Sequence, residues 1–143
     1  FQHELFHAYH ASRFQQCDQL WCSLWTEGLA THVAATLNPG ASDSELLLTL
    51  PEPIRPEIEN DPRPAVCAVR ARLDSTRSED IRALFSFERL GPSIPPRAGY
   101  LIGQWVAADL GKTRSLQELA AMGGDSLRAE IAASLDRMAD CSG

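Results

Sequence analysis

The spacing of the prolines constrains the fold of this 143-residue chain more than any other feature. Five of the nine prolines lie between positions 51 and 64, where they divide the chain into short helices and turns;. The proline-free stretches 20–37 and 97–110 have helical periodicity instead;. No stretch alternates apolar and polar residues in the way that a half-buried strand does. The sequence therefore predicts an all-α fold, and its length fits a single domain over residues 1–143;.

Capping and stop signals give the approximate bounds of the expected helices. The first covers Phe1 to about Arg13, and "NPG" ends the second after Leu37. "SDSE" at 42–45 has the capping-box pattern that starts a helix, here before the apolar run "LLLTL";. Ser78 begins a further capped segment, "SEDIRALF". The other expected helices are "AVCAVRARL", "RAGYLIGQWVAADL", "SLQELAAM" and "DSLRAEIAASLDRMA".

Composition and net charge argue against two classes of protein. Apolar residues make up 44% of the chain, an ordinary value for a globular protein;. The net charge is -6, whereas a nucleic-acid-binding protein normally carries a basic patch that releases counterions. No stretch approaches the roughly 20 apolar residues that span a bilayer. We therefore expect no nucleic-acid partner and no transmembrane segment in this chain, and we leave its localisation open.

The four cysteines are too few and too scattered to indicate a disulfide scaffold. They lie at positions 17, 22, 67 and 141. Cys17 and Cys22 also lack the second pair that would complete a four-cysteine zinc site. We expect buried or free thiols.

The first expected helix contains the sequence "HELFH", in which His3 and His7 are four residues apart. On a helix both imidazoles project from one face, so two ring nitrogens can reach one ion at about 2.0–2.1 Å. Glu4 lies about 100° around the helix from His3 and can reach a water molecule on that ion. A carboxylate there can act as a general base. The alternative is a chance match on a helix whose histidines form ordinary hydrogen bonds.

Catalytic zinc needs a third protein ligand, and Glu27 is the candidate. Nineteen residues separate it from His7, enough for a turn and an antiparallel return. Gly28 is small and would let the histidine helix approach closely. Thr31, one turn further on, could hydrogen-bond the second nitrogen of a ligand histidine. The alternative for Glu27 is a solvated helix carboxylate.

The combined pattern resembles the gluzincin metallopeptidases, in which HExxH precedes a Glu by this distance. "WTEGLATHVA" is similar to a segment of their aminopeptidase branch and of bacterial predicted zinc-dependent proteases, and "PPRAGYLIGQWVA" is similar to a later segment of those bacterial families. The resemblance implies a zinc peptidase acting on peptides or proteins. It implies His3, His7 and Glu27 as zinc ligands, with Glu4 as the general base.

Arg97 and Tyr100, in the last of these segments, are candidates for stabilising the oxyanion that forms during hydrolysis. The alternatives are an aromatic core residue for Tyr100 and a surface charge near a helix N-terminus for Arg97. His10 and His32 are expected to be ordinary polar residues rather than ligands.

Zincin catalytic domains normally place a small sheet before the HExxH helix, and its edge holds the substrate backbone. The chain starts two residues before His3. We therefore interpret it as the helical, C-terminal part of a larger zincin-like domain, and expect activity to depend on an upstream segment of the same protein. Two alternatives remain open: a zinc-stabilised, non-catalytic binding or regulatory domain, and a metal-free helical interaction domain. The sequence does not distinguish exopeptidases from endopeptidases.

Overall fold

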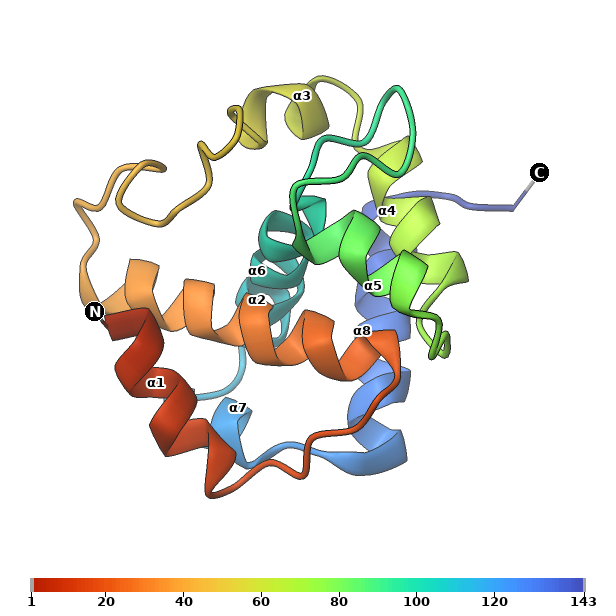
Figure 1. The fold of residues 1–143 in the computed structure, drawn as a ribbon. Coiled ribbons are helices and arrows are strands. Elements are labelled where there is room, and N and C mark those ends of the chain that lie inside the picture. Colours follow the sequence, from red (N-terminus) through yellow and green to blue (C-terminus); the bar gives the residue numbers. More distant parts are fainter. Residues whose placement is uncertain (1, 143) are drawn as a thin grey trace.

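Helices α2 (Leu20–Leu37) and α6 (Ala98–Leu110) form the centre of the fold, which the computed structural model describes for residues 2–142 (Figure 1). The other helices within that range are α1 (Gln2–Ala11), α3 (Arg55–Asn60), α4 (Arg63–Ala71), α5 (Ser78–Phe85), α7 (Leu116–Ala121) and α8 (Gly124–Met138). These residues form no strand beyond an isolated bridge between Gly91 and Ile94. The predicted all-α class is confirmed.

The central position of α2 and α6 follows from their apolar composition. Both helices are apolar on nearly all sides, as expected of buried helices. The side chains of Trp25 in α2 and Ile102 in α6 are 1% and 0% exposed. Gly28 meets Gly103 where the helices cross, so the prediction that Gly28 faces the histidine helix is wrong. A Cβ atom on Gly28 would lie 2.2 Å from the carbonyl carbon of Gly103, a distance that leaves no room for a side chain.

Aromatic side chains fill the contact between α1 and α2. Phe6 and His10 are the buried residues of α1. The ring of His10 lies between those of Phe6 and Phe14, with centroid distances of 5.3 and 5.0 Å. Phe14 in turn meets Trp21 of α2 edge-on at 6.3 Å. Since these rings fix how α1 rotates against α2, they also fix which face of α1 points toward Glu27.

One predicted helix boundary differs from the structure, and another agrees with it. The first helix ends at Ala11, two residues before the predicted Arg13, and Phe1 lies outside the described residues. The predicted helix Ser78–Phe85 has the expected bounds, but it is not capped by a side chain, because Arg77 occupies the N-cap position and makes no side-chain cap hydrogen bond. Exposed residues at helix ends add little packing energy, so propensity alone locates such boundaries poorly.

The segment after α2 does not form the helix that "SDSE" predicted. Glu45 accepts a hydrogen bond from the Ser42 amide at 3.1 Å, and its own amide donates to Ser42 Oγ at 3.2 Å, so the capping box is present. The chain nevertheless continues as turns, and Leu47 adopts a left-handed conformation with φ 63°. Leu48 is 0% exposed. Burial of this side chain, followed by prolines, decides the path here against local helix propensity.

All four cysteines are paired, so the prediction of buried or free thiols is wrong. Cys17 bonds Cys22 across the entry into α2. Cys67 of α4 bonds Cys141, which follows α8, and 74 positions separate the two along the chain. The tertiary contact between α4 and α8 brings the second pair together, and spacing alone does not indicate it.

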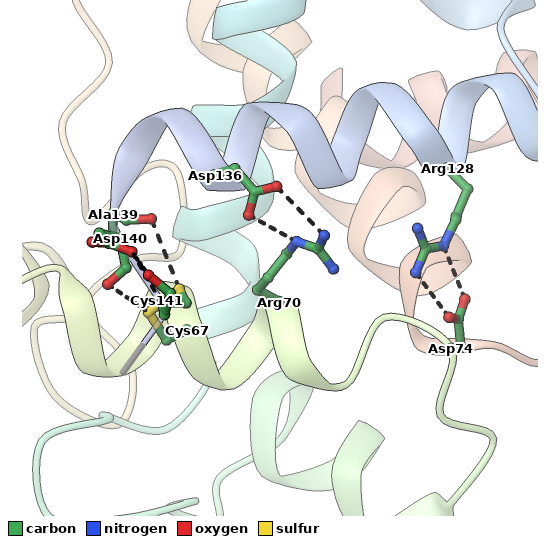
Figure 2. Close-up of polar contacts among 9 residues, drawn as sticks. Cys67, Arg70, Asp74, Arg128, Asp136, Ala139, Asp140 and Cys141 are labelled. Carbon is green, nitrogen blue, oxygen red and sulfur yellow. Dashed lines mark hydrogen bonds and ion pairs between the residues drawn. A yellow bond between two sulfur atoms is a disulfide. The ribbon is translucent and has the colours of Figure 1, made fainter.

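Ion pairs extend the contact between α4 and α8 beyond the disulfide (Figure 2). Arg70 of α4 donates to Asp136 of α8 at 3.0 Å. Nearer the N-terminus of α8, Arg128 donates to Asp74, in the turn after α4, at 2.8 Å. Both pairs are largely solvated, so each contributes little stability and mainly sets the register of the two helices.

Candidate metal centre

Three side chains converge where α1 meets α2. His3 and His7 come from one face of α1 and Glu27 from the middle of α2. The Nε2 atoms of the two histidines are 3.0 Å apart, and they lie 3.1 and 3.0 Å from Glu27 Oε1. All three residues are partly buried, and each offers a ligand atom within 4.8 Å of the others. The structure thus brings together the three residues that the sequence predicted as ligands.

No placement of hydrogen atoms turns all three contacts of this triangle into normal hydrogen bonds. A neutral imidazole Nε2 carries either one hydrogen or one lone pair, and an ionised carboxylate only accepts. If both histidines donate to Glu27, two N–H groups face each other across the 3.0 Å between His3 and His7. If one histidine donates to the other, its own contact with Glu27 has no hydrogen. One of the three short contacts is therefore always unfavourable, whereas a cation among the three would accept a lone pair from each.

The donor set and its spacing fit zinc. Ligand atoms at about 2.0–2.1 Å from a tetrahedral zinc ion lie roughly 3.3 Å from one another. The observed separations of 3.0, 3.0 and 3.1 Å are close to that value. Two imidazoles and one carboxylate, with a fourth position for water, are also the ligand set of one class of catalytic zinc site.

The electrostatics keep Glu27 in the form that a metal requires. Burial acts against its ionisation, but hydrogen bonds with His3 and His7, together with their charges, lower the pKa of Glu27 to about 2. The hydrogen bond with Glu27 raises the pKa of His7 against the opposing effect of burial. Glu27 is therefore a carboxylate at neutral pH, as metal ligation needs.

Glu4 is exposed on the neighbouring face of α1, directly after His3. Its charge contributes to raising the pKa of both His7 and Tyr100. Glu4 thus lies within electrostatic reach of the ligands without belonging to the triangle of donor atoms. That is the position expected of a base that acts on a water molecule beside the metal.

Tyr100, in the first turn of α6, lies within electrostatic reach of Glu27 and Glu4. Burial raises the pKa of its phenol, and the charge of Glu27 raises it further. Arg97 lies over the Tyr100 ring, with its guanidinium carbon 4.3 Å from the ring centroid. The guanidinium also donates to the carbonyl oxygens of Leu47 and Leu50. Arg97 therefore attaches the loop before α3 to the start of α6, a role that the sequence did not indicate.

Three further polar residues that the sequence analysis considered stay outside the triangle. His10 is 1% exposed, burial lowers its pKa to about 4, and its Nε2 has no hydrogen-bond partner among the described residues. Burial also lowers the pKa of His32, which lies near Gly111. Thr31 donates to the Glu27 carbonyl oxygen at 2.9 Å, so the predicted hydrogen bond to a ligand histidine is not formed. Its hydroxyl hydrogen is used within α2.

The sequence did not identify Gly103, which allows α6 to cross α2 closely at Gly28, next to Glu27. It lies within the quoted "RAGYLIGQWVA" segment, but nothing in the sequence paired it with Gly28. A small residue in the middle of an otherwise bulky apolar helix was the available signal.

Comparisons of the chain with models of protein families, with curated proteins and with solved structures find no match. The resemblance to gluzincins therefore depends on the sequence motifs alone. Among residues 2–142, no helix combines the length and the apolar character needed to cross a bilayer.

Proposed function

We propose that the protein is a zinc-dependent peptidase of the gluzincin type. The observation that carries this proposal is the triangle formed by His3, His7 and Glu27, with sides of 3.0 to 3.1 Å that no arrangement of protons satisfies;. The two histidine–carboxylate distances are also ordinary for hydrogen bonds, so the 3.0 Å contact between the Nε2 atoms of His3 and His7 is what favours a shared ion over a chance pair;. The three residues would hold the ion, and Glu4 and Tyr100 would supply the remaining groups.

Each residue has a distinct chemical task in this proposal. Bound zinc supplies Lewis acidity and lowers the pKa of a water molecule. Glu4 would act as the general base: it would take a proton from the attacking water and would pass that proton to the leaving amine. The Tyr100 phenol, which is protonated at neutral pH, would donate to the carbonyl oxygen as negative charge develops there. Arg97 holds Tyr100 from behind its ring.

The presence of Glu4 favours a peptidase over a zinc-stabilised binding domain. A metal that only stabilises the fold has no use for a base beside it, whereas peptide hydrolysis requires one. Glu4 is exposed and lies outside the triangle, so its replacement can test catalysis without removing a ligand.

The test is the zinc content of purified variants, and their peptidase activity with the upstream segment of the protein present. The wild type should bind one zinc ion per chain, and Glu27→Ala should lose it. Glu4→Gln should keep the zinc and lose hydrolysis of a peptide mixture, by at least about 100-fold. Glu79→Ala, which replaces an exposed carboxylate of α5, is the matched control and should change neither property. A wild-type chain that binds no zinc after reconstitution would refute the proposal.

A further inference from the structure

Helix α1, which carries two of the three candidate zinc ligands, is held in place by few contacts. It packs mainly against α2, and its buried residues are Phe6 and His10. On its outer face, Leu5 and Tyr9 are 56% and 38% exposed. A short helix that buries so little surface detaches readily unless the chain that follows restrains it. The geometry of the metal centre therefore depends on the connection between α1 and α2.

This connection, residues 12–19, contains neither helix nor strand. A hydrogen bond and a disulfide attach its middle to α2. The Thr26 hydroxyl donates to the side-chain oxygen of Gln16 at 2.8 Å. The disulfide joins Cys17 to Cys22. Because the hydrogen bond is exposed to water and contributes little, the covalent bond is the stronger restraint on the connection;.

The disulfide attaches the connection to a fixed part of the fold. Cys22 lies in the first turn of α2, and its side chain is 0% exposed. The Leu20 amide donates to the Ser75 carbonyl oxygen at 2.8 Å. The Trp21 amide donates to the Leu73 carbonyl oxygen at 3.0 Å. The segment after α4 therefore holds the start of α2 with or without the disulfide, and the disulfide extends that restraint to the connection.

Aromatic side chains continue the contact from the disulfide to α1. Trp21 lies within the short covalent loop that Cys17 and Cys22 close. Its indole meets the Phe14 ring edge-on at 6.3 Å, and Phe14 stacks on His10 of α1 at 5.0 Å. Since His10 belongs to the same helix as the candidate histidine ligands, loosening of this loop reaches the metal centre through three rings.

The two disulfides differ in their relation to the metal centre. The bond between Cys67 and Cys141 joins α4 to the segment after α8, on the other side of the central helices from α1 (Figure 1). Its loss leaves the contact between α1 and α2 in place. Cys17 is half-buried, whereas Cys22 is buried. The sulfur of Cys17 is therefore the one that a thiol or disulfide reagent can attack.

We propose that oxidation of Cys17 and Cys22 assembles the metal centre, so that the chain holds zinc tightly only where disulfides form. The two thiols exchange with a disulfide oxidant. A bond forms between the two Sγ atoms and the S–S bond of the oxidant breaks, while two electrons and both thiol protons pass to the oxidant, which leaves as two thiols. Disulfides form and persist in oxidising compartments and are rare in a reducing cytosol. The inference rests on the proposed zinc site and adds redox control to it.

The expected effect follows from the fraction of molecules in which α1 is docked on α2. His3 and His7 lie on α1 and Glu27 lies on α2, so only the docked form offers all three ligands to one ion. If opening of the disulfide lowers the docked fraction to roughly one tenth, the zinc affinity falls about tenfold.

The experiment compares the zinc affinities of variants, measured by competition with a chromogenic chelator. Cys17→Ala/Cys22→Ala removes the bond together with both thiols, which would otherwise compete for zinc. Cys17→Ala also breaks the bond but keeps the buried sulfur of Cys22, and with it the packing of the core. Cys67→Ala/Cys141→Ala, which removes the other disulfide, is the matched control.

Both variants at Cys17 should bind zinc about tenfold or more weakly than the wild type, whereas the control should stay within about twofold. A second measurement needs no metal. Hydrogen exchange of the zinc-free proteins, followed by mass spectrometry, should be faster in α1 for the Cys17 variants only. Circular dichroism reports whether each variant folds.

Stepwise reduction of the zinc-loaded wild type provides the same test without a substitution. The protein is treated with increasing amounts of a phosphine reductant, the thiols in each sample are alkylated, and mass spectrometry shows which disulfide has opened. Zinc that remains bound is measured in the same samples. Zinc release should follow the opening of the bond between Cys17 and Cys22, not that of the bond between Cys67 and Cys141.

The outcomes separate this inference from the proposed function. Equal zinc affinity in all four proteins would overturn the redox inference and leave the zinc site intact. An equal loss from both disulfide pairs would also overturn it, because the effect would then be one of general stability. If the variants do not fold, the reduction series decides, and zinc retained after Cys17 and Cys22 separate would contradict the inference. An oxidised wild type that binds no zinc would overturn the proposed zinc site and the redox inference together.

Discussion

Gly28 of α2 and Gly103 of α6 lie in direct backbone contact, and a Cβ atom on Gly28 would approach the Gly103 carbonyl carbon to 2.2 Å. Glu27 directly precedes the first glycine, and Tyr100 stands about one turn before the second. The crossing therefore sets the distance between a candidate metal ligand and the candidate oxyanion donor. The two glycines thus position the side chains of Glu27 and Tyr100, which carry the proposed chemistry.

Replacement of Gly28 by alanine should destabilise the protein and disturb the metal centre. The added methyl group meets backbone atoms, which cannot move aside as a flexible side chain can, so the helices must separate. We expect a loss of about 1–3 kcal/mol in the free energy of unfolding, measured in urea, and weaker zinc binding. Gly40→Ala is the control, because nothing lies within 4 Å of a Cβ atom there. Equal stability of the two variants would contradict the close crossing.

Removal of the Tyr100 hydroxyl should reduce catalysis without loss of zinc. The ring contacts of Tyr100 with Phe85 and Arg97 do not need the hydroxyl, so Tyr100→Phe should fold normally. We expect kcat on a cleaved peptide to fall about 100-fold, the effect of removing one oxyanion donor. Tyr9→Phe removes the hydroxyl of an exposed tyrosine on α1 and should leave kcat unchanged. An unchanged kcat in Tyr100→Phe would remove this residue from the mechanism.

His10 should make the protein less stable in mild acid. Burial lowers its pKa from 6.5 to about 4, so between these values the unfolded chain binds a proton that the folded chain does not. Unfolding therefore becomes easier as the pH falls through this window, and stability is full above pH 6.5;. The contribution amounts to about 3 kcal/mol between pH 7 and pH 4.

His10→Phe tests this pH dependence, because it keeps a ring between Phe6 and Phe14 and removes the titrating group. Urea unfolding with a chelator present, at both pH values, excludes effects of metal binding. The variant should lose about 3 kcal/mol less than the wild type on acidification. Parallel losses in both proteins would mean that His10 takes up its proton in the folded state.

The two disulfides should contribute unequally to stability. Cys67 and Cys141 are 74 positions apart, whereas Cys17 and Cys22 are 5 apart. In the chain-entropy description the longer loop contributes about 4 kcal/mol and the shorter about 2 kcal/mol. Urea unfolding of Cys67→Ala/Cys141→Ala and of Cys17→Ala/Cys22→Ala measures the difference. A larger loss from the shorter pair would show that local packing around Cys22, which is 0% exposed, outweighs loop entropy.

The sequence by itself determined the helical class and the residues of the candidate site. Helical periodicity in 20–37 and 97–110 is a local property, and so is the projection of His3 and His7 from one face of a helix. Glu27 could be predicted because its residue type and distance along the chain match a known motif. These features depend on residues close together in the chain or on one recurring pattern, so no tertiary information was needed.

Only the tertiary structure decided the contacts between distant segments. It paired Gly28 with Gly103, joined Cys67 to Cys141, and directed Arg97 to the carbonyls of Leu47 and Leu50. It also overrode the helix that the capping box at 42–45 predicts, because burial of a leucine outweighs the few tenths of a kcal/mol that propensity supplies. Such contacts depend on how helices pack across the core, and the energy that selects them is spread over many apolar side chains that no short motif records.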